Sequence, residues 1–360
     1  MTPADSADKK AFSSLKLAEW PETDRGLMQE ARKPKTFLRA GGAASEWRPA
    51  TLEAVIYRNG VFLWWLRKTG RLMPGSAALE RVTQDNVESF IEAYGACHAG
   101  TSLAGTLHGV YEATRVMHPE ADLSDLRETV AGLKAIAKPR PKLPRMADQG
   151  ALIELGEALI AHGVKRVQEG HMLSAAAVRD GCMILFLIAC PLRRASFECL
   201  RLGQSLLRDH LGYRVELGPK QTKTRQPFDS EVWAFLVPYL HYYVDVARPV
   251  LQARSGLPDE GWLWLGAEGE RMTGKSISRR VRELVTKHLG RPMSLHLFRD
   301  SAATTVAVHA SAKIGIVGDV LGHTRHETSE KHYNQAKGVE AARRYHGLLK
   351  EQRERERPRK

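Results

Sequence analysis

The segment 294–334 gathers side chains that could do chemistry on a phosphate ester. It offers His296, Arg299, His323 and Tyr333. An arginine can hold two phosphate oxygens at once, and a histidine can move a proton near neutral pH. A tyrosine can act as a covalent nucleophile. A basic, imidazole-rich cluster beside one tyrosine therefore predicts chemistry on a phosphate.

Residue spacing indicates how these side chains are held. His296 and Arg299 are three residues apart, so a helix would place them on one face. A second short helix is expected over 314–321, with His323 projecting from the turn that follows. A third helix would then carry Tyr333.

The pattern of His296-x-x-Arg299, a Leu-Gly-His triplet ending at His323, and then Tyr333 resembles the C-terminal signature of the tyrosine recombinases, the phage-integrase-like enzymes. That family also has an upstream arginine, which Arg193 matches, with Arg194 as its neighbour. Four motifs in the same order are more specific than any one of them.

The family further has a lysine on a β-hairpin between its two arginine motifs. Lys223 fits that place in its Thr-Lys-Thr context, and Lys220 is the alternative. Three departures concern the turns: Pro191 replaces a common glycine, Asp300 stands where histidine is common, and Tyr333 follows His323 by ten residues where nine is frequent.

The resemblance implies a DNA strand transferase that acts as a site-specific recombinase or integrase. Tyr333 would attack a DNA phosphate, form a 3′-phosphotyrosyl bond and release a 5′-hydroxyl. Arg193 and Arg299 would hold the non-bridging oxygens. No cofactor and no metal are expected, because the covalent bond conserves the phosphodiester energy.

The remaining catalytic roles are also implied by the resemblance. His296 would assist proton transfer from the nucleophile, Lys223 would protonate the leaving oxygen, and His323 would bind the phosphate. The partners would be double-stranded DNA, further copies forming a homo-tetramer on two DNA sites, and accessory DNA-bending proteins. The expected location is the cytoplasm, with the nucleoid.

Composition is consistent with a nucleic-acid partner. The chain has 360 residues, enough for two domains, and a net charge of +13. Its four cysteines lack metal-ligand spacing and read as reduced thiols of a cytosolic protein. No signal peptide is expected, and the apolar run 182–190 is too short to span a membrane, so it predicts a core helix.

The expected fold is mainly α with a small β-sheet or hairpin, an α+β catalytic domain preceded by a helical DNA-binding bundle. The predicted parts are a polar arm at 1–48, a DNA-clamping helical domain at 49–137, a basic proline-rich linker at 138–145, a catalytic domain at 146–347 and a basic tail at 348–360.

Several local expectations can be checked against a structure. The polar composition of residues 1–48 predicts a solvated arm, or else an arm that contacts DNA through Lys33, Lys35 and Arg39. Strands are predicted over 213–217 and 261–265. Helices are expected over three ranges: 175–189, 231–251 and 275–289.

The C-terminal residues Val339, Ala342, Tyr345 and Leu349 form one apolar stripe. The stripe would pack either on its own domain or on a neighbouring protomer.

Two other functions remain open on the sequence. One is a DNA-binding protein of the same fold without catalysis, and the other is an enzyme similar to a type IB topoisomerase. A metal-dependent nuclease is a less favoured third alternative, which EDTA would inactivate. His323, His326 and His332 could form a metal cluster, but they have no accompanying acidic or cysteine ligand at a firm spacing.

Overall fold

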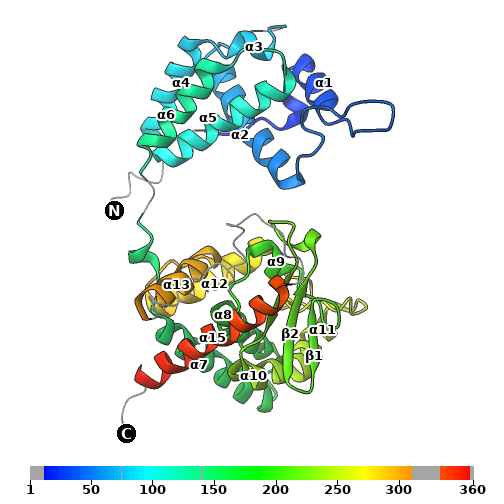
Figure 1. Cartoon of the computed structure of the whole chain (residues 1–360), viewed down its shortest axis with the longest axis vertical. Coiled ribbons are helices and arrows are strands. Elements are labelled where there is room, and N and C mark those ends of the chain that lie inside the picture. Colours follow the sequence, from blue (N-terminus) through cyan, green and yellow to red (C-terminus); the bar gives the residue numbers. More distant parts are fainter. Residues whose placement is uncertain (1–11, 74, 139–140, 310–332, 357–360) are drawn as a thin grey trace. The chain divides into compact units, whose positions relative to one another are not determined.

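The computed structural model describes residues 12–73, 75–138, 141–309 and 333–356, and it divides into two compact units (Figure 1). The first unit is Met1–Arg140 and the second is Pro141–Lys360. The division falls inside the predicted proline-rich linker.

The first unit is helical. Its helices are α1 (Glu22–Ala31), α2 (Pro49–Lys68), α3 (Ala78–Arg81), α4 (Gln84–Cys97), α5 (Gly100–Met117) and α6 (Ser124–Ile136). Local sequence explains where they begin: Pro49 suits the first turn of α2, and the Thr83 hydroxyl accepts a hydrogen bond from the backbone of Asn86 to cap α4. The aromatic side chains of Phe62 and Phe90 pack edge to face in its core.

Residues 12–48 are not a solvated arm. Leu15, Trp20 and Met28 are buried in the core of the first unit. The Leu15 backbone also donates a hydrogen bond to the carbonyl of Gly60 in α2. The expectation was wrong because these apolar residues are spaced widely among polar ones, so no helical or strand period revealed them.

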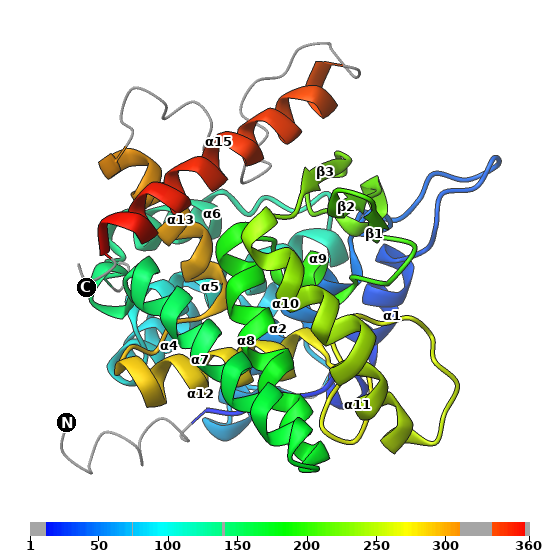
Figure 2. The same ribbon diagram turned by 90° about the horizontal axis from the view of Figure 1, so that it is seen from below.

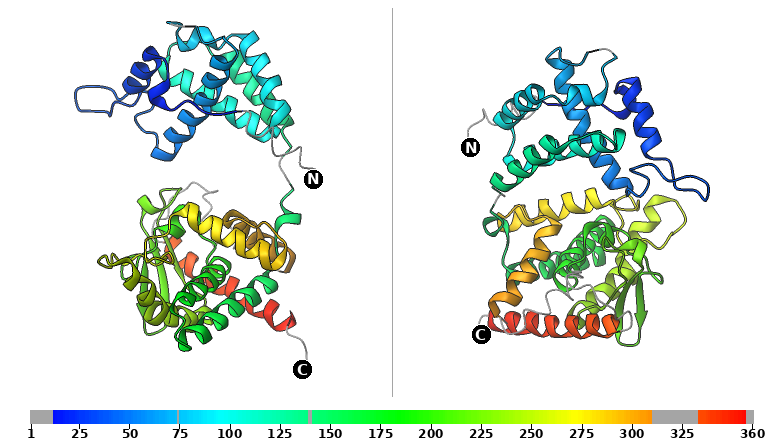
Figure 3. Two further views of the ribbon diagram at one scale, coloured as in Figure 1. Left: turned by 180° about the vertical axis from the view of Figure 1, so that it is seen from behind. Right: turned by 45° about the horizontal axis from the view of Figure 1, so that its top comes forward.

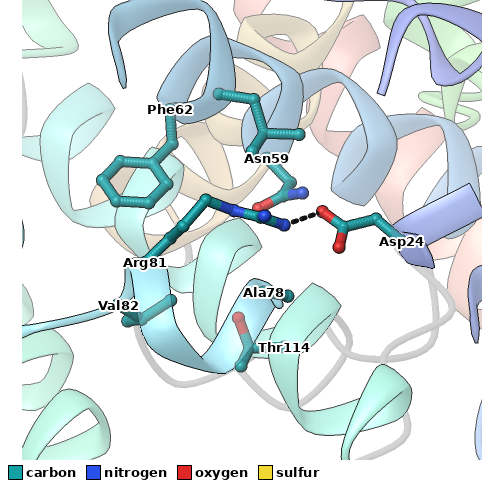
Figure 4. Close-up of a pocket in the computed structure, with 8 residues that line it drawn as sticks. Asp24, Asn59, Phe62, Ala78, Arg81, Val82 and Thr114 are labelled. Carbon is teal, nitrogen blue, oxygen red and sulfur yellow. Dashed lines mark hydrogen bonds and ion pairs between the residues drawn. The ribbon is translucent and has the colours of Figure 1, made fainter. Parts of the chain in front are cut away.

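A buried ion pair braces the first unit. Arg81 of α3 donates to the carboxylate of Asp24 in α1, beside a small pocket also lined by Asn59, Phe62 and Thr114 (Figure 4). Burial raises the pKa of Asp24, although the positive charge of Arg81 opposes that shift. The pocket is interior to the first unit, and the ion pair accounts for its polar lining.

The second unit combines helices with one small sheet. Its helices are α7 (Gln149–Gln168), α8 (Ala175–Ala189), α9 (Arg194–Glu198), α10 (Val237–Tyr242), α11 (Arg248–Ser255), α12 (Gly274–Leu289), α13 (Leu295–His309) and α15 (Tyr333–Glu356). Strands β1 (Leu206–Asp209), β2 (Gly212–Leu217) and β3 (Phe228–Glu231) form an antiparallel sheet in the order β1-β2-β3. The predicted fold class, mainly α with a small sheet, is confirmed.

Two local predictions in the second unit need correction. The segment 261–265 is not a strand of the sheet, because it pairs only through single bridges, Trp262 with Arg201 and Leu265 with Arg271. The helix expected from residue 231 does not begin there, because Glu231 is still paired in β3; a 3₁₀ turn, Ala234–Leu236, leads into α10 at Val237. A five-residue π-helical segment, Tyr243–Ala247, then joins α10 to α11.

Helix α8 forms the centre of the second unit. It packs against α7 at glycines, since a Cβ on Gly181 would lie 2.4 Å from the carbonyl oxygen of Gly156. Among the described residues, one stretch, Met172–Ala189, is long and apolar enough to cross a membrane by length and composition alone. Because 72% of this stretch is buried inside the protein, it is a core helix, as the sequence predicted.

Helix α15 packs on its own unit, beside α13 and the sheet (Figure 2). Ala342, Tyr345 and Leu349 are buried there, and Arg343 pairs with Glu231 at 2.7 Å. Packing within the chain is therefore the alternative that the structure contains. The helix also continues to Glu356, past the boundary placed at residue 348.

Candidate active site

The turn that leaves α8 positions Arg193. Leu192 is buried, and Arg193 follows as the N-cap of the short helix α9, where its carbonyl accepts from the backbone of Phe197 at 2.9 Å. Phe197 is fully buried and stacks on Trp264 at 4.9 Å between ring centroids. The core contact of Phe197 therefore fixes the place where the half-buried Arg193 side chain begins.

Arg299 reaches the same turn from α13. Its neighbours Leu297 and Phe298 are buried, and Arg299 itself is only 5% exposed. One of its terminal nitrogens donates to the carbonyl of Pro191, two residues before Arg193. Two segments that lie far apart in the sequence therefore place their arginines at one point of the fold.

The two guanidinium groups repel each other. Burial and, second to it, the positive charge of Arg193 together lower the pKa of Arg299 to about 10, although Cys190 and the carboxylate of Asp300 act in the opposite direction. Burial also lowers the pKa of Arg193, by less, because that side chain is only half-buried. Within the described part of the chain, no carboxylate pairs with Arg193. Such a pair suits an anion that offers several oxygens.

The end of α8 is the hub of the site. The last carbonyls of a helix have no partner within it. Here the carbonyl of Ile188 accepts from the Tyr345 hydroxyl at 2.9 Å, and that of Ala189 accepts from the His346 ring at 3.1 Å. With the bond from Arg299 to Pro191, side chains of α13 and α15 meet at the turn before Arg193. No pattern in the sequence indicated these bonds.

The loop that carries Lys223 is tied to the helix that follows Arg193. The Ser196 hydroxyl of α9 donates to the carbonyl of Gln221 at 2.8 Å. The Thr222 hydroxyl closes the loop by donating to the carbonyl of Gln226 at 2.7 Å. Lys223 is exposed, and so is the alternative Lys220, so burial does not distinguish the two lysines.

His296 lies on α13 with Arg299, as expected, but its side chain is 71% exposed. Its Nε2 lies 3.8 Å from the carboxylate of Asp300. That carboxylate also pairs with Lys142 of the linker at 2.9 Å, and Arg291 donates to the carbonyl of Pro144. This pairing of Asp300 was not predicted from the sequence. A carboxylate at an unusual position and a lysine in the linker were the available signals.

Two predicted site residues remain, Tyr333 and His323, and the structure describes the backbone of the first alone. Tyr333 is the first residue of the described part of α15, whose later residues dock on the end of α8. His323 and the helix expected over 314–321 lie outside the described residues.

The structure thus defines a mainly helical protein whose second unit brings two arginines together at the end of α8. No family model matches this chain. It is 28% identical over 155 residues to a protein named tyrosine recombinase XerC from Pseudomonas fluorescens, covering 43% of this chain and 47% of the relative. It is 25% identical over 200 residues to tyrosine recombinase XerC from Pseudomonas aeruginosa, covering 55% and 57%.

The chain therefore spans about half the length of the curated relatives that it matches. A crystal structure of XerA recombinase covers 88% of this chain and 96% of its own, with 15% identity and a TM-score of 0.34, a similarity too low to support an argument. The matches to the two XerC proteins confirm the resemblance to tyrosine recombinases that the motifs predicted.

Proposed function

We propose that this protein is a site-specific DNA recombinase that cuts and rejoins DNA through a 3′-phosphotyrosine intermediate. The observation that carries the proposal is the convergence of Arg193 and Arg299 at the end of α8. Arg193 has no carboxylate partner among the described side chains and lies close enough to Arg299 to lower the pKa of that group, so an anion bound beside both would be stabilised by both. The relatives' name, tyrosine recombinase, supports a DNA phosphate as that anion.

The two arginines have the chemistry that phosphoryl transfer requires. A guanidinium presents parallel N–H donors that match two phosphate oxygens. Its charge counts most where burial excludes water, which applies to Arg299. Arg193, which is half-buried, would complete the grip from the solvent side. The negative charge that develops in the transition state would then lie against both groups.

Tyr333 is the proposed nucleophile. Its phenol has an ordinary pKa near 10, so it needs cations nearby and a group that takes its proton. His296 is exposed one turn from Arg299 and would accept that proton. Lys223 would donate a proton to the leaving 5′-oxygen, and His323 would hydrogen-bond the phosphate.

The partner proposed for this site is double-stranded DNA. The net charge of +13 favours a polyanion. Strand exchange needs two DNA sites, for which we propose four copies of the chain, aided by DNA-bending proteins. The proposed location is the cytoplasm, on the nucleoid.

Covalent trapping tests this function. The substrate is a pool of duplexes of randomised sequence, each nicked so that the short fragment released by cleavage diffuses away and prevents religation. Wild-type protein should form a protein–DNA adduct that survives denaturant and EDTA. Tyr333→Phe should bind the pool and form no adduct, because only the attacking oxygen is lost.

Tyr345→Phe is the matched control on the same helix. Its hydroxyl is buried and bonded to the carbonyl of Ile188, so the adduct should persist after this substitution. An adduct with Tyr333→Phe, or cleavage that EDTA abolishes, contradicts the proposed function. Relaxation of any plasmid without exchange between two DNA molecules would indicate a topoisomerase instead.

A further inference from the structure

A hairpin of residues 32–43, here called the α1 hairpin, projects from the first unit directly after α1 (Figure 3). Backbone hydrogen bonds close it along its length. Ala44 donates to Ala31 at 2.8 Å, Gly42 to Lys33 at 2.9 Å, and Thr36 to Arg39 at 3.1 Å. The tip of the hairpin is therefore the segment 36–39, which the bond between Thr36 and Arg39 closes.

The base of the α1 hairpin is packed closely. A Cβ added to Gly42 would lie 2.3 Å from the carbonyl oxygen of Ala31, and one added to Gly41 would lie 2.9 Å from the backbone nitrogen of Lys35. Only glycine allows so close an approach of two chain segments. The hairpin is thus anchored on the end of α1 and holds its tip away from the unit.

The tip of the α1 hairpin exposes two large apolar side chains to solvent. Phe37 is 103% exposed and Leu38 is 88% exposed, the two highest values among large apolar side chains in the described part of the chain. Elsewhere in this unit the aromatic side chains Phe62 and Phe90 are fully buried. An anchored hairpin that presents two adjacent apolar side chains indicates a surface for a partner.

Charge identifies the kind of partner. Lys35 and Arg39 flank the tip, Arg32 and Lys33 lie at the base, and residues 32–43 include no acidic residue. Lys33 pairs with Glu30 of α1 at 2.6 Å, so the cations nearest the tip are Lys35 and Arg39. Duplex DNA has the complementary arrangement, an apolar base stack between two rows of phosphates.

We propose that the α1 hairpin is a wedge that distorts DNA. Phe37 and Leu38 enter the minor groove and separate neighbouring base pairs, while Lys35 and Arg39 contact the phosphates on either side. Apolar side chains inserted in this way unstack a base step and kink the duplex. The inference rests on the proposed DNA-directed function. It adds to that function an element of the first unit that bends the DNA.

The test uses the full-length protein and a mixed-sequence duplex labelled with a fluorophore at each end. Energy transfer between the ends reports bending, and a titration at several salt concentrations reports affinity and its salt dependence. Wild-type protein should bind and shorten the end-to-end distance. The tip variant, Phe37→Ala with Leu38→Ala, should lose the bend and about tenfold in affinity, with an unchanged salt slope.

The flank variant, Lys35→Ala with Arg39→Ala, should behave differently. Loss of two phosphate contacts should lower the slope of log affinity against log salt by about two. The matched control is Leu211→Ala, which removes an apolar side chain, 74% exposed, from the turn between β1 and β2 beside the acidic Asp209. The control should bind and bend DNA as wild type does.

The outcomes separate the two proposals. A tip variant that bends DNA as wild type does overturns the wedge and leaves the proposed function standing. A tip variant that instead loses self-association in the absence of DNA identifies a protein contact and also overturns the wedge. Wild-type protein that binds no duplex overturns the proposed function and the wedge together. All of these side chains are exposed, so an unchanged melting temperature verifies folding.

Discussion

Two pairs of arginines in the second unit differ in whether the protein supplies a carboxylate partner. Arg179 and Arg280 share the buried carboxylate of Asp180, at 2.6 Å and 2.7 Å. Arg193 and Arg299 converge at the end of α8, where Arg193 has no carboxylate partner among the described side chains. The first pair shares a carboxylate of the protein, whereas Arg193 of the second pair has none among the described side chains.

The difference has a physical reason. A buried charge is expensive unless an opposite charge or several hydrogen bonds compensate it. Asp180 of α8 provides that compensation for Arg179 of the same helix and for Arg280 of α12, and its bond to Arg280 joins the two helices. Arg299 remains a cation at neutral pH, with a pKa of about 10, and its repulsion from Arg193 persists in the free protein. Binding of a phosphate would relieve that repulsion.

The largest predicted effect concerns the pair that shares Asp180. Asp180→Asn leaves the guanidinium of Arg179, itself 4% exposed, without its carboxylate. The free energy of unfolding should fall by about 3–5 kcal/mol, because a buried charge then lacks compensation. The exposed pair of Arg254 and Glu268 is the control. Glu268→Gln should change stability by less than about 1 kcal/mol. Equal effects in denaturant unfolding would contradict the contrast.

The next effect concerns Arg193 and Arg299. Arg193→Ala should slow formation of the covalent DNA adduct by about 10²- to 10³-fold, because one donor to the transition state is lost. Its folding stability should hold or rise, since a repulsion with Arg299 is removed. Arg194→Ala, at the exposed neighbour, should change neither quantity. Loss of stability without slower cleavage would make Arg193 a structural residue.

The smallest effect concerns His346, a buried side chain whose hydrogen-bond partner is a carbonyl of the protein itself. Burial lowers its pKa to about 4, and its ring donates to the carbonyl of Ala189. The unfolded state therefore takes up a proton below about pH 6.5, where the folded state does not. The contribution of His346 to the free energy of unfolding should be fully present above about pH 6.5. It should fall by roughly 3 kcal/mol in total as the pH drops from there through 4.

Unfolding measured against pH tests this linkage. His346→Gln cannot titrate and keeps an N–H donor, so the difference between wild type and this variant should shrink steadily from pH 7 towards pH 4. A difference that is constant over this range would show that His346 does not control the acid sensitivity of the second unit.

The sequence predicted the parts of the molecule that follow local rules. Helix α13 carries His296 and Arg299 as their spacing indicated, and the fully apolar stretch of α8 proved to be the core. The strand at 213–217 was also correct, because alternation over a few residues is a local signal. The resemblance to recombinases came from the order of motifs, which survives even at low identity.

Contacts between distant segments were beyond such rules. The bonds from Tyr345 and His346 to the end of α8 join residues more than a hundred positions apart, and a buried tyrosine has no distinctive local pattern. The pairing of Asp300 with Lys142 is of the same kind. The packing of Trp20 was missed because single apolar residues in a polar segment show no period.

One measurement tests the central claim most directly, that Tyr333 makes a covalent bond to DNA at the site of the two arginines. Wild-type protein trapped on the nicked duplexes is digested with protease and nuclease, and the modified peptide is sequenced by mass spectrometry. We expect a nucleotide joined through its 3′-phosphate to Tyr333. A nucleotide on any other residue, or one joined through its 5′-phosphate, would contradict it.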